Sequence, residues 1–152
     1  MGKSLACRVP RKLTVGSDFT GMHTAGFALQ NLGVHHTTEF TCVNHSPCER
    51  VAKFHFHPKI HYRCITKRQT RHMPTCHLYT WTAPCISFST NGTMRGENHP
   101  AGKLLRVPFK YMNRHRPRCV VMENVAALFQ LKKYRNTVKK ILYHMKSMGY
   151  AT

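Results

Sequence analysis

A cysteine and a glutamate each stand just beyond a short apolar run, and both residue types can carry out catalysis. Cys85 follows the run Leu78–Trp81, while Glu123 and Asn124 follow the run Cys119–Met122. Apolar runs of this length predict buried strands. Open α/β sheets place their chemistry at the carboxyl ends of neighbouring strands. The pattern therefore predicts a thiol nucleophile, Cys85, and an acid, Glu123, at one edge of a sheet.

A glycine-bearing turn is the second chemical signal. Gly16 to Gly21 separates the first predicted strand, Leu13 to Val15, from a helix that begins at Thr24. Glycines in such a turn let a ligand approach the backbone close to a helix N-terminus. By itself the turn is a weak motif for a cofactor.

The rest of the chain alternates short strands with helices. The first helix should run from Thr24 to Leu32 and end at Gly33. Ser46 to Glu49 resembles a capping box that opens a second helix reaching about Phe54. Further strands are predicted at Phe40–Val43 and, more briefly, at Cys64–Ile65, and Lys67, Arg68, Arg71 and His72 indicate a solvated loop. A helix is predicted over Leu104–Asn113, where Pro108 should start or kink it. A closing helix that stops at Gly149 has an apolar stripe of Tyr134, Val138, Ile141, Leu142, Met145 and Met148.

This alternation is typical of a parallel sheet with crossover helices. We expect a three-layer α/β domain with strand order 3-2-1-4-5, in which the strands at Leu13 and Leu78 are neighbours. The domain should cover residues 13–152 and follow a basic arm over residues 1–12. Trp81, the single tryptophan, lies in a predicted strand and should belong to the core.

The charge of the chain favours polyanionic partners. The 152 residues carry a formal net charge of +19 and only five acidic residues, so nucleic acid is the first partner to consider. No stretch of about 20 apolar residues predicts a membrane span, and the N-terminus does not resemble a secretory signal. We therefore expect an intracellular protein with reduced thiols, nuclear if eukaryotic. The cysteines and histidines lack zinc-finger spacing, so no metal is expected.

Three motifs in order resemble those of the cytosine-5 DNA methyltransferases. They are Asp18-Phe19-Thr20-Gly21, Pro84-Cys85-Ile86-Ser87-Phe88-Ser89, and the strand that ends in Glu123-Asn124-Val125. The resemblance covers most of the chain, from about Thr14 to Tyr150. It implies the Rossmann-like fold of methyltransferases that use S-adenosylmethionine.

The resemblance also implies site residues. The catalytic ones would be Cys85, Glu123 and Asn124. Cys85 would attack C6 of a cytosine that has left the duplex, C5 would take the methyl group, and Glu123 would hold N3 and the exocyclic amine. The implied cofactor-binding residues are Asp18, Phe19, Thr20, Gly21, Asn44, Ile65 and Pro84, and the implied nucleic-acid-binding residues are Ser87, Ser89 and Arg95.

Several positions depart from the family pattern. Val43, beside Asn44, stands where an acid usually binds the cofactor ribose, and Cys64 stands where an aspartate touches adenine. His77 and Ile86 replace an acid and a glutamine. The later strands, a Gln-x-Arg-x-Arg motif and the target recognition region are also absent.

We therefore expect part of a catalytic domain that is inactive alone and that needs a complementary half. Two alternatives stay open. One is a basic nucleic-acid-binding pseudoenzyme that has lost its cofactor, and the other is an RNA cytosine-5 methyltransferase.

Overall fold

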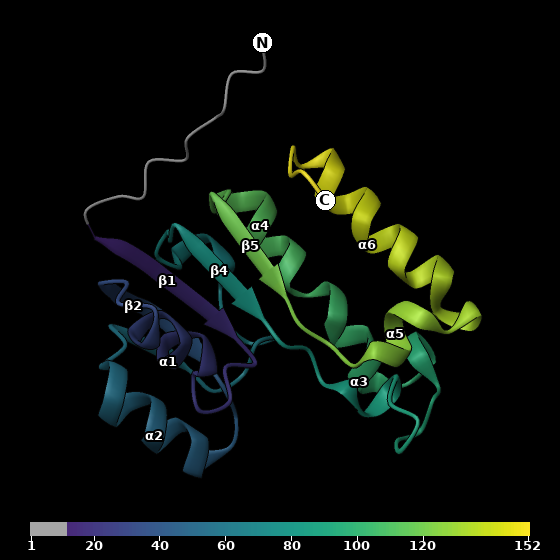
Figure 1. Cartoon of the computed structure of the whole chain (residues 1–152), viewed down its shortest axis with the longest axis horizontal. Coiled ribbons are helices and arrows are strands. Elements are labelled where there is room, and N and C mark those ends of the chain that lie inside the picture. Colours follow the sequence, from purple (N-terminus) through teal and green to yellow (C-terminus); the bar gives the residue numbers. More distant parts are fainter. Residues whose placement is uncertain (1–11) are drawn as a thin grey trace.

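The computed structural model describes residues 12–152, which form five parallel strands and the helices that cover them (Figure 1). The predicted basic arm over residues 1–12 lies outside the described residues except for Lys12. The strands are β1 (Leu13–Asp18), β2 (His36–Cys42), β3 (Ile60–Tyr62), β4 (Leu78–Trp81) and β5 (Cys119–Met122), in the order β3-β2-β1-β4-β5. The predicted order, the parallel directions and the β1–β4 adjacency are all confirmed.

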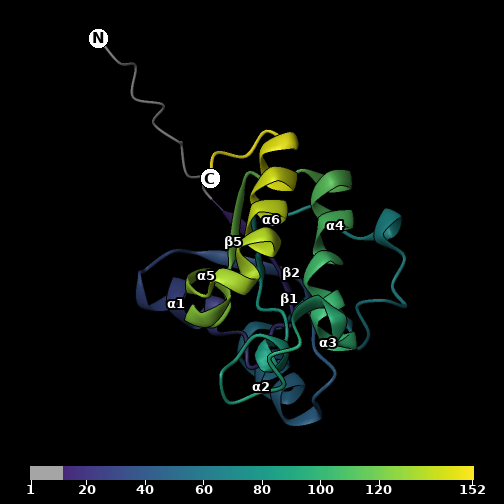
Figure 2. The same cartoon turned by 90° about the vertical axis from the view of Figure 1, so that its right-hand side faces the viewer.

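Helices cover both faces of the sheet and make three layers, as predicted (Figure 2). One layer holds α1 (Thr24–Asn31) and α2 (Ser46–Phe56), which pack on each other through Phe27 and Phe56. The second helical layer includes α4 (Pro108–His115) and α6 (Arg135–Ser147). Two short helices, α3 (Pro100–Lys103) and α5 (Ala126–Gln130), precede α4 and α6 respectively.

An irregularity in β2 turns Thr38 and Phe40 toward opposite helical layers. Val15 of β1 pairs with Thr38 and Gly16 pairs with Phe40, so Glu39 is an extra residue in the ladder. Thr38 bonds His23 beside α1, whereas the Phe40 ring packs 5.1 Å from Tyr111 of α4. A bulge of this kind re-aims the side chains that follow it.

The main core lies under α4 and α6. Trp81, Tyr79, Tyr111 and Phe40 are fully buried there, so the prediction of Trp81 as a core residue is confirmed. Edge and tilted contacts between these rings are a favourable way to pack aromatic residues. This aromatic layer fixes the positions of β1, β2 and β4 relative to α4.

Several predicted boundaries need correction. The first strand continues past Gly16 to Asp18, and β2 begins at His36 rather than Phe40. The third strand is Ile60–Tyr62, not Cys64–Ile65, because the Ile-His-Tyr run pairs with β2 directly. Pro108 starts α4, and the residues before it, Leu104–Arg106, form a separate 3-10 turn.

The predicted capping box is wrong. Ser46 is already inside α2, the N-cap is His45, and no side chain caps the helix. Glu49 instead bonds Lys53 at 2.6 Å and lies 3.2 Å from Nε of Arg63. The acid is used for ion pairing across α2 and β3, not for the helix start.

The predicted helix stops are confirmed by backbone geometry. Gly33 and Gly149 have φ values of 67° and 86° directly after α1 and α6, a conformation in which glycine carries no steric penalty. Leu142 of the predicted apolar stripe is instead 40% exposed, and Leu32, at the end of the first predicted helix, is 74% exposed. The other members of the closing stripe pack on the core as predicted.

His23, just before α1, is a buried titratable group. Its Nε2 lies 3.1 Å from Oγ1 of Thr38, its ring meets Phe56 edge-on, and its Nδ1 has no partner among the described residues. Burial, with a smaller effect from His36, lowers the pKa of His23 to about 4. The unfolded chain should therefore bind a proton at His23 that the folded chain excludes between about pH 4 and pH 6.5.

Stability should consequently fall as the pH drops from about 6.5 to about 4, with ~3 kcal/mol attributable to His23. Urea unfolding at several pH values measures this loss. His23→Asn keeps a residue tolerant of φ 68° and should flatten the profile in that window. The exposed His35→Asn serves as the control and should keep the parent slope. Parent and His23→Asn curves that run parallel would contradict the account.

Candidate functional site at the carboxyl edge of the sheet

The five strands end at one edge, where their following loops meet. The loop after β1 contains Phe19, Thr20 and Gly21. Phe19 and Gly21 have φ values of 53° and 54°, so the chain turns sharply at both. No neighbouring atom would contact a Cβ at Gly21, which means that the backbone conformation, not lack of space, calls for glycine there.

Hydrogen bonds hold this loop on β2 and β4. The Thr20 amide donates to the Cys42 carbonyl at 3.0 Å, and the Cys42 amide donates to Thr20 Oγ1 at 3.1 Å. Thr82, after β4, donates from Oγ1 to the Phe19 carbonyl at 2.7 Å. The glycine turn is thus a fixed wall between the ends of β2 and β4.

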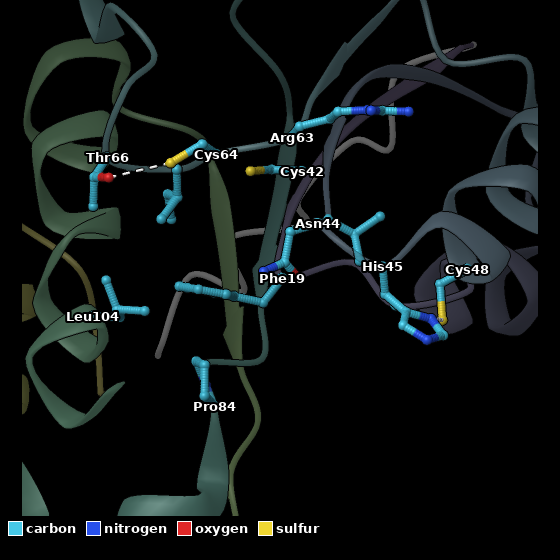
Figure 3. A pocket seen from close by; sticks show the side chains of 13 residues that line it. Phe19, Cys42, Asn44, His45, Cys48, Arg63, Cys64, Thr66, Pro84 and Leu104 are labelled. Atoms are coloured by element: carbon cyan, nitrogen blue, oxygen red, sulfur yellow. Dashed lines mark hydrogen bonds between the residues drawn. The ribbon is translucent and has the colours of Figure 1, made fainter. Parts of the chain in front are cut away.

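A cavity of about 360 Å³ lies beside the glycine turn (Figure 3). In the close view Phe19 lies at its centre between Asn44 and Pro84, with Cys64, Thr66 and Leu104 to one side. The walls are mostly apolar, and the polar atoms come from the loops after β2 and β3. Five residues predicted to bind a cofactor line this cavity: Phe19, Gly21, Asn44, Ile65 and Pro84.

The two other predicted cofactor residues lie elsewhere. Thr20 is buried and bonds the backbone of Ser17 and Cys42. Asp18 is fully buried, and its carboxylate accepts hydrogen bonds from Arg68 and Tyr79. Arg68 was expected in a solvated loop, yet its side chain is only 2% exposed. That prediction was wrong because the sequence around Arg68 carries no mark of burial.

The cavity also contains thiols of two kinds. Burial is the main cause that raises the pKa of Cys42 to about 12, and a buried thiol of this kind is a poor nucleophile. Cys64 differs, since hydrogen bonds from the Thr66 hydroxyl, 3.2 Å away, and from nearby backbone amides lower its pKa. Cys64 therefore presents a hydrogen-bond acceptor near the end of β3. Leu104, His45 and Cys48 also line the cavity and were not anticipated from the sequence.

The predicted catalytic residues stand on the loops after β4 and β5. Cys85 is exposed and opens a 3-10 turn, Cys85–Ser87, in which its carbonyl accepts from the amides of Phe88 and Ser89, each at 2.8 Å. The Glu123 amide donates to the Trp81 carbonyl at 3.1 Å. Both loops therefore start from the paired ends of β4 and β5.

Asn124 joins these two loops. Its Nδ2 donates to the Ala83 carbonyl at 3.0 Å, and its Oδ1 accepts from the Val125 amide at 3.0 Å. One polar atom of the side chain thus bonds the backbone two residues before Cys85, and the other bonds the backbone of its own loop. Asn124 thus positions the cysteine loop against the glutamate loop.

A second hollow of about 370 Å³ adjoins the first. Phe19 and Gly21 line both, while Glu123 and Thr82 line the second. The glycine turn accordingly separates a mostly apolar cavity from an open groove that carries the carboxylate.

The distribution of carboxylates singles out Glu123. Four of the five acids pair with cations: Asp18 with Arg68, Glu39 with Lys59, Glu49 with Lys53 and Arg63, and Glu97 with Arg106. Within residues 12–152 the exposed Glu123 carboxylate makes neither an ion pair nor a hydrogen bond. Since none of these residues occupies it, the Glu123 carboxylate can bind a ligand.

The predicted nucleic-acid residues are not equally accessible. Ser87 is fully buried, with Oγ 3.2 Å from Nδ1 of His99. Ser89 is half-buried and accepts from the Asn91 amide at 3.2 Å. Arg95 is exposed and lines a hollow with Lys133 and Glu97.

Other site types find no support in the described part of the chain. Residues 12–152 contain no group of three or more histidine, cysteine or acidic side chains arranged to hold a metal ion. Nor do these residues form a helix with the length and apolar character needed to cross a bilayer.

Known relatives agree with the motifs. Residues 19–152 match the family model for C-5 cytosine-specific DNA methylases. The chain is 34% identical over 86 residues to the type II methyltransferase M.DsaV of Dactylococcopsis salina, covering 57% of this chain and 24% of that protein. It is 27% identical over 145 residues to the orphan methyltransferase M.Rho11sI of Bacillus phage rho11s, covering 91% and 28% respectively. The chain spans about a quarter of the length of these two curated relatives.

A solved structure shows the same fold. The Dnmt2 methyltransferase of S. pombe superposes with a TM-score of 0.69 over 91% of this chain and 43% of that one, at 14% sequence identity. The predicted Rossmann-like methyltransferase fold is therefore confirmed. Since the family model matches the chain from the glycine turn to its last residue, this protein belongs to the C-5 cytosine-specific DNA methylase family.

Proposed function

We propose that residues 13–152 form the cofactor-binding part of a DNA cytosine-5 methyltransferase. The methyl donor is S-adenosylmethionine, and the acceptor is C5 of a cytosine flipped out of DNA. The observation that carries the proposal is Glu123, which has no ion-pair partner among residues 12–152 and lies on the loop that Asn124 ties to the Cys85 loop. The chain has 24 basic residues and five acids, so an acid that no described cation pairs is available to a substrate.

The cavity fits the cofactor in chemical character. Phe19, Ile65 and Leu104 offer apolar surface to a purine ring, and Asn44 and Cys64 offer hydrogen-bonding groups to its polar edges. Cys64 stands where the family carries an aspartate, and its sulfur, which lines the cavity, can also accept a hydrogen bond. When bound, S-adenosylmethionine supplies an electrophilic methyl group.

The chain's own residues carry the remaining chemistry. The Cys85 thiolate adds to C6 of cytosine, which makes C5 nucleophilic. Glu123 holds N3 and the exocyclic amine, so negative charge does not build up on the ring. Once C5 carries the methyl group, a solvent water molecule takes the proton from C5. The electron pair of that C–H bond restores the C5–C6 double bond, and the Cys85 thiolate leaves C6. Asn124 contributes by holding the Ala83 carbonyl, and thus the cysteine turn, in place.

Basic side chains supply the affinity for nucleic acid. Lysines and arginines occupy the exposed faces around α6, and Arg95 and Ser89 lie near the cysteine turn, where they are proposed to contact the substrate strand. The buried Ser87 would instead support the turn through His99. Because DNA is the proposed substrate, the protein is proposed to act inside the cell, in the nucleus if the cell is eukaryotic.

A complementary segment is proposed to complete the enzyme. β5 is an edge strand within the described sheet, with Cys119 and Val121 exposed, and Phe129 of α5 is 50% exposed nearby. Strands of such a segment would pair with that edge and cover those side chains. The isolated chain is accordingly proposed to be inactive.

Two alternatives accompany this proposal. The replaced acids at Val43 and Cys64 favour a pseudoenzyme that binds nucleic acid without the cofactor. The replaced acid at His77 does not favour a pseudoenzyme, because His77 lies at the opposite edge of the sheet, where its Nδ1 bonds Thr14. RNA instead of DNA as the acceptor rests on the same cysteine chemistry.

Covalent trapping tests the mechanism. With S-adenosylmethionine and DNA that contains 5-fluorocytosine, Cys85 should form a stable adduct, because fluorine at C5 blocks the final elimination. Cys85→Ser should abolish the adduct, and Glu123→Gln should reduce its yield at least tenfold. The chain alone should give little, and adding the part of M.Rho11sI outside its matched region should raise the yield. Gel shift under denaturing conditions measures the adduct.

The exposed thiol of Cys119, at the end of β5 opposite to Glu123, provides the matched control. Cys119→Ser should trap like the parent, which excludes non-specific thiol reaction. RNA that contains 5-fluorocytosine tests the second acceptor. If a folded, complemented and cofactor-bound protein traps neither substrate, the pseudoenzyme alternative replaces the mechanism.

Nucleic-acid binding should depend strongly on salt and little on sequence. Isotherms at about 50 and 200 mM salt should show a large loss of affinity. Lys139→Gln with Lys140→Gln should reduce the logarithmic salt slope by about 2. A double variant with the same charge change, Lys53→Gln with Lys59→Gln, removes lysines already paired with Glu49 and Glu39 and should leave the slope near the parent value. Affinity that is equal at both salt concentrations would rule out phosphate contacts.

A further inference from the structure

A charged pair buried behind the cavity has no role in the chemistry above. Asp18 ends β1 with no exposed surface. Two guanidinium nitrogens of Arg68 donate to its two carboxylate oxygens, and the Tyr79 hydroxyl donates to one of them. This fork-to-fork geometry fixes orientation as well as charge.

The guanidinium is held on several sides. Its central carbon lies 5.7 Å from the ring centres of both Phe40 and Tyr62. Together with Asp18 and Tyr79, these contacts come from β1, β2, β3 and β4. Burial lowers the pKa of Arg68, but the hydrogen bonds and charge of Asp18 outweigh this and leave it raised. Arg68 therefore remains charged.

The pair connects two walls of the cavity. Asp18 directly precedes Phe19 of the glycine turn, and Arg68 follows Thr66 by two residues. Cys64, Ile65 and Thr66 belong to an irregular stretch between β3 and the 3-10 turn Thr70–His72. Along that stretch Arg63 makes an exposed ion pair with Glu49, and Arg68 makes the buried one. Arg68 is thus the firm attachment of this wall to the sheet.

Stability alone does not account for such a pair. Burying two charges costs desolvation, and a well-packed apolar pair of similar size often stabilises a protein equally well. A guanidinium fork, in contrast, sets distance and direction in a way that apolar side chains do not.

We propose that the Asp18–Arg68 pair is a positioning element that sets the separation between Phe19 and the wall formed by Cys64, Ile65 and Thr66, and so tunes affinity for the cofactor. The inference rests on the proposed function, since it assigns the cavity to S-adenosylmethionine. Asp18 acts here through the loop that follows it and makes no contact with the cofactor.

A double variant, Asp18→Leu with Arg68→Met, removes both charges and leaves neither unpaired. It should fold with a melting temperature near that of the parent, and its nucleic-acid affinity should be unchanged. Its affinity for S-adenosylhomocysteine, measured by calorimetric titration, should fall at least tenfold. Amide hydrogen exchange at Ile65, Thr66 and Lys67 should become at least tenfold faster, while the β4 amides keep their protection.

A second double variant, Glu39→Leu with Lys59→Met, removes an ion pair away from the cavity and should change neither affinity nor exchange at these positions. If the first double variant fails to fold, Arg68→Lys replaces it. Lysine keeps the charge but loses the fork, so exchange and affinity should shift in the same direction.

The outcomes separate the two claims. A parent chain that binds no cofactor contradicts the proposed function, and the exchange rates still decide the role of the pair. Parent-like exchange at the Cys64–Thr66 wall in a folded variant overturns the inference. So does unchanged affinity for S-adenosylhomocysteine, because a purely structural pair would alter the melting temperature alone.

Discussion

The parallel pairing of β1 with β4 is the constraint on which the site depends. It aligns Asp18 with Trp81, so the loops after these strands leave the sheet side by side. Thr82 then bonds the backbone of both Asp18 and Phe19. Pairing of β4 with β5 brings in the third loop, with Glu123 held by the Trp81 carbonyl. Residues more than 100 positions apart thereby meet at one edge, held mainly by the strand pairing.

Electrostatics explains the second feature of the site. The chain carries a net charge of +19, and cations surround nearly every acid. Asp18, Glu39, Glu49 and Glu97 form ion pairs that serve the fold, while the exposed Glu123 carboxylate has no cation partner in the part of the chain that the structure describes. The same positive field favours a polyanion close to that carboxylate. We propose that nucleic acid suits both features, since its bases can contact the Glu123 carboxylate while its phosphates contact the basic surface.

The sequence predicted the parts of this structure that depend on local pattern. The apolar runs at β4 and β5 predicted both strands with correct bounds. The run at β4 suits an inner parallel strand because its four residues are buried or half-buried, whereas β5 is an edge strand in which Cys119 and Val121 are exposed. Non-local features were not predictable. Ile60–Tyr62 is only three residues long and is interrupted by a histidine, and it is a strand because β2 offers it an edge. Arg68 stands in a basic stretch, and only the position of Asp18 in space explains its burial. Likewise, the family resemblance identified cavity-lining residues such as Asn44, whereas Leu104 reaches the cavity from a distant turn.

The central claim is that the cavity beside the glycine turn binds S-adenosylmethionine, and a calorimetric titration of the intact chain tests it most directly. The account predicts one site per chain. Leu104→Trp, which places a larger ring in the cavity wall, should weaken binding at least tenfold, while Leu32→Trp, the same change at a residue that is 74% exposed, should bind like the parent. A folded parent that gives no binding heat, or a folded Leu104→Trp variant with parent affinity, would contradict the claim.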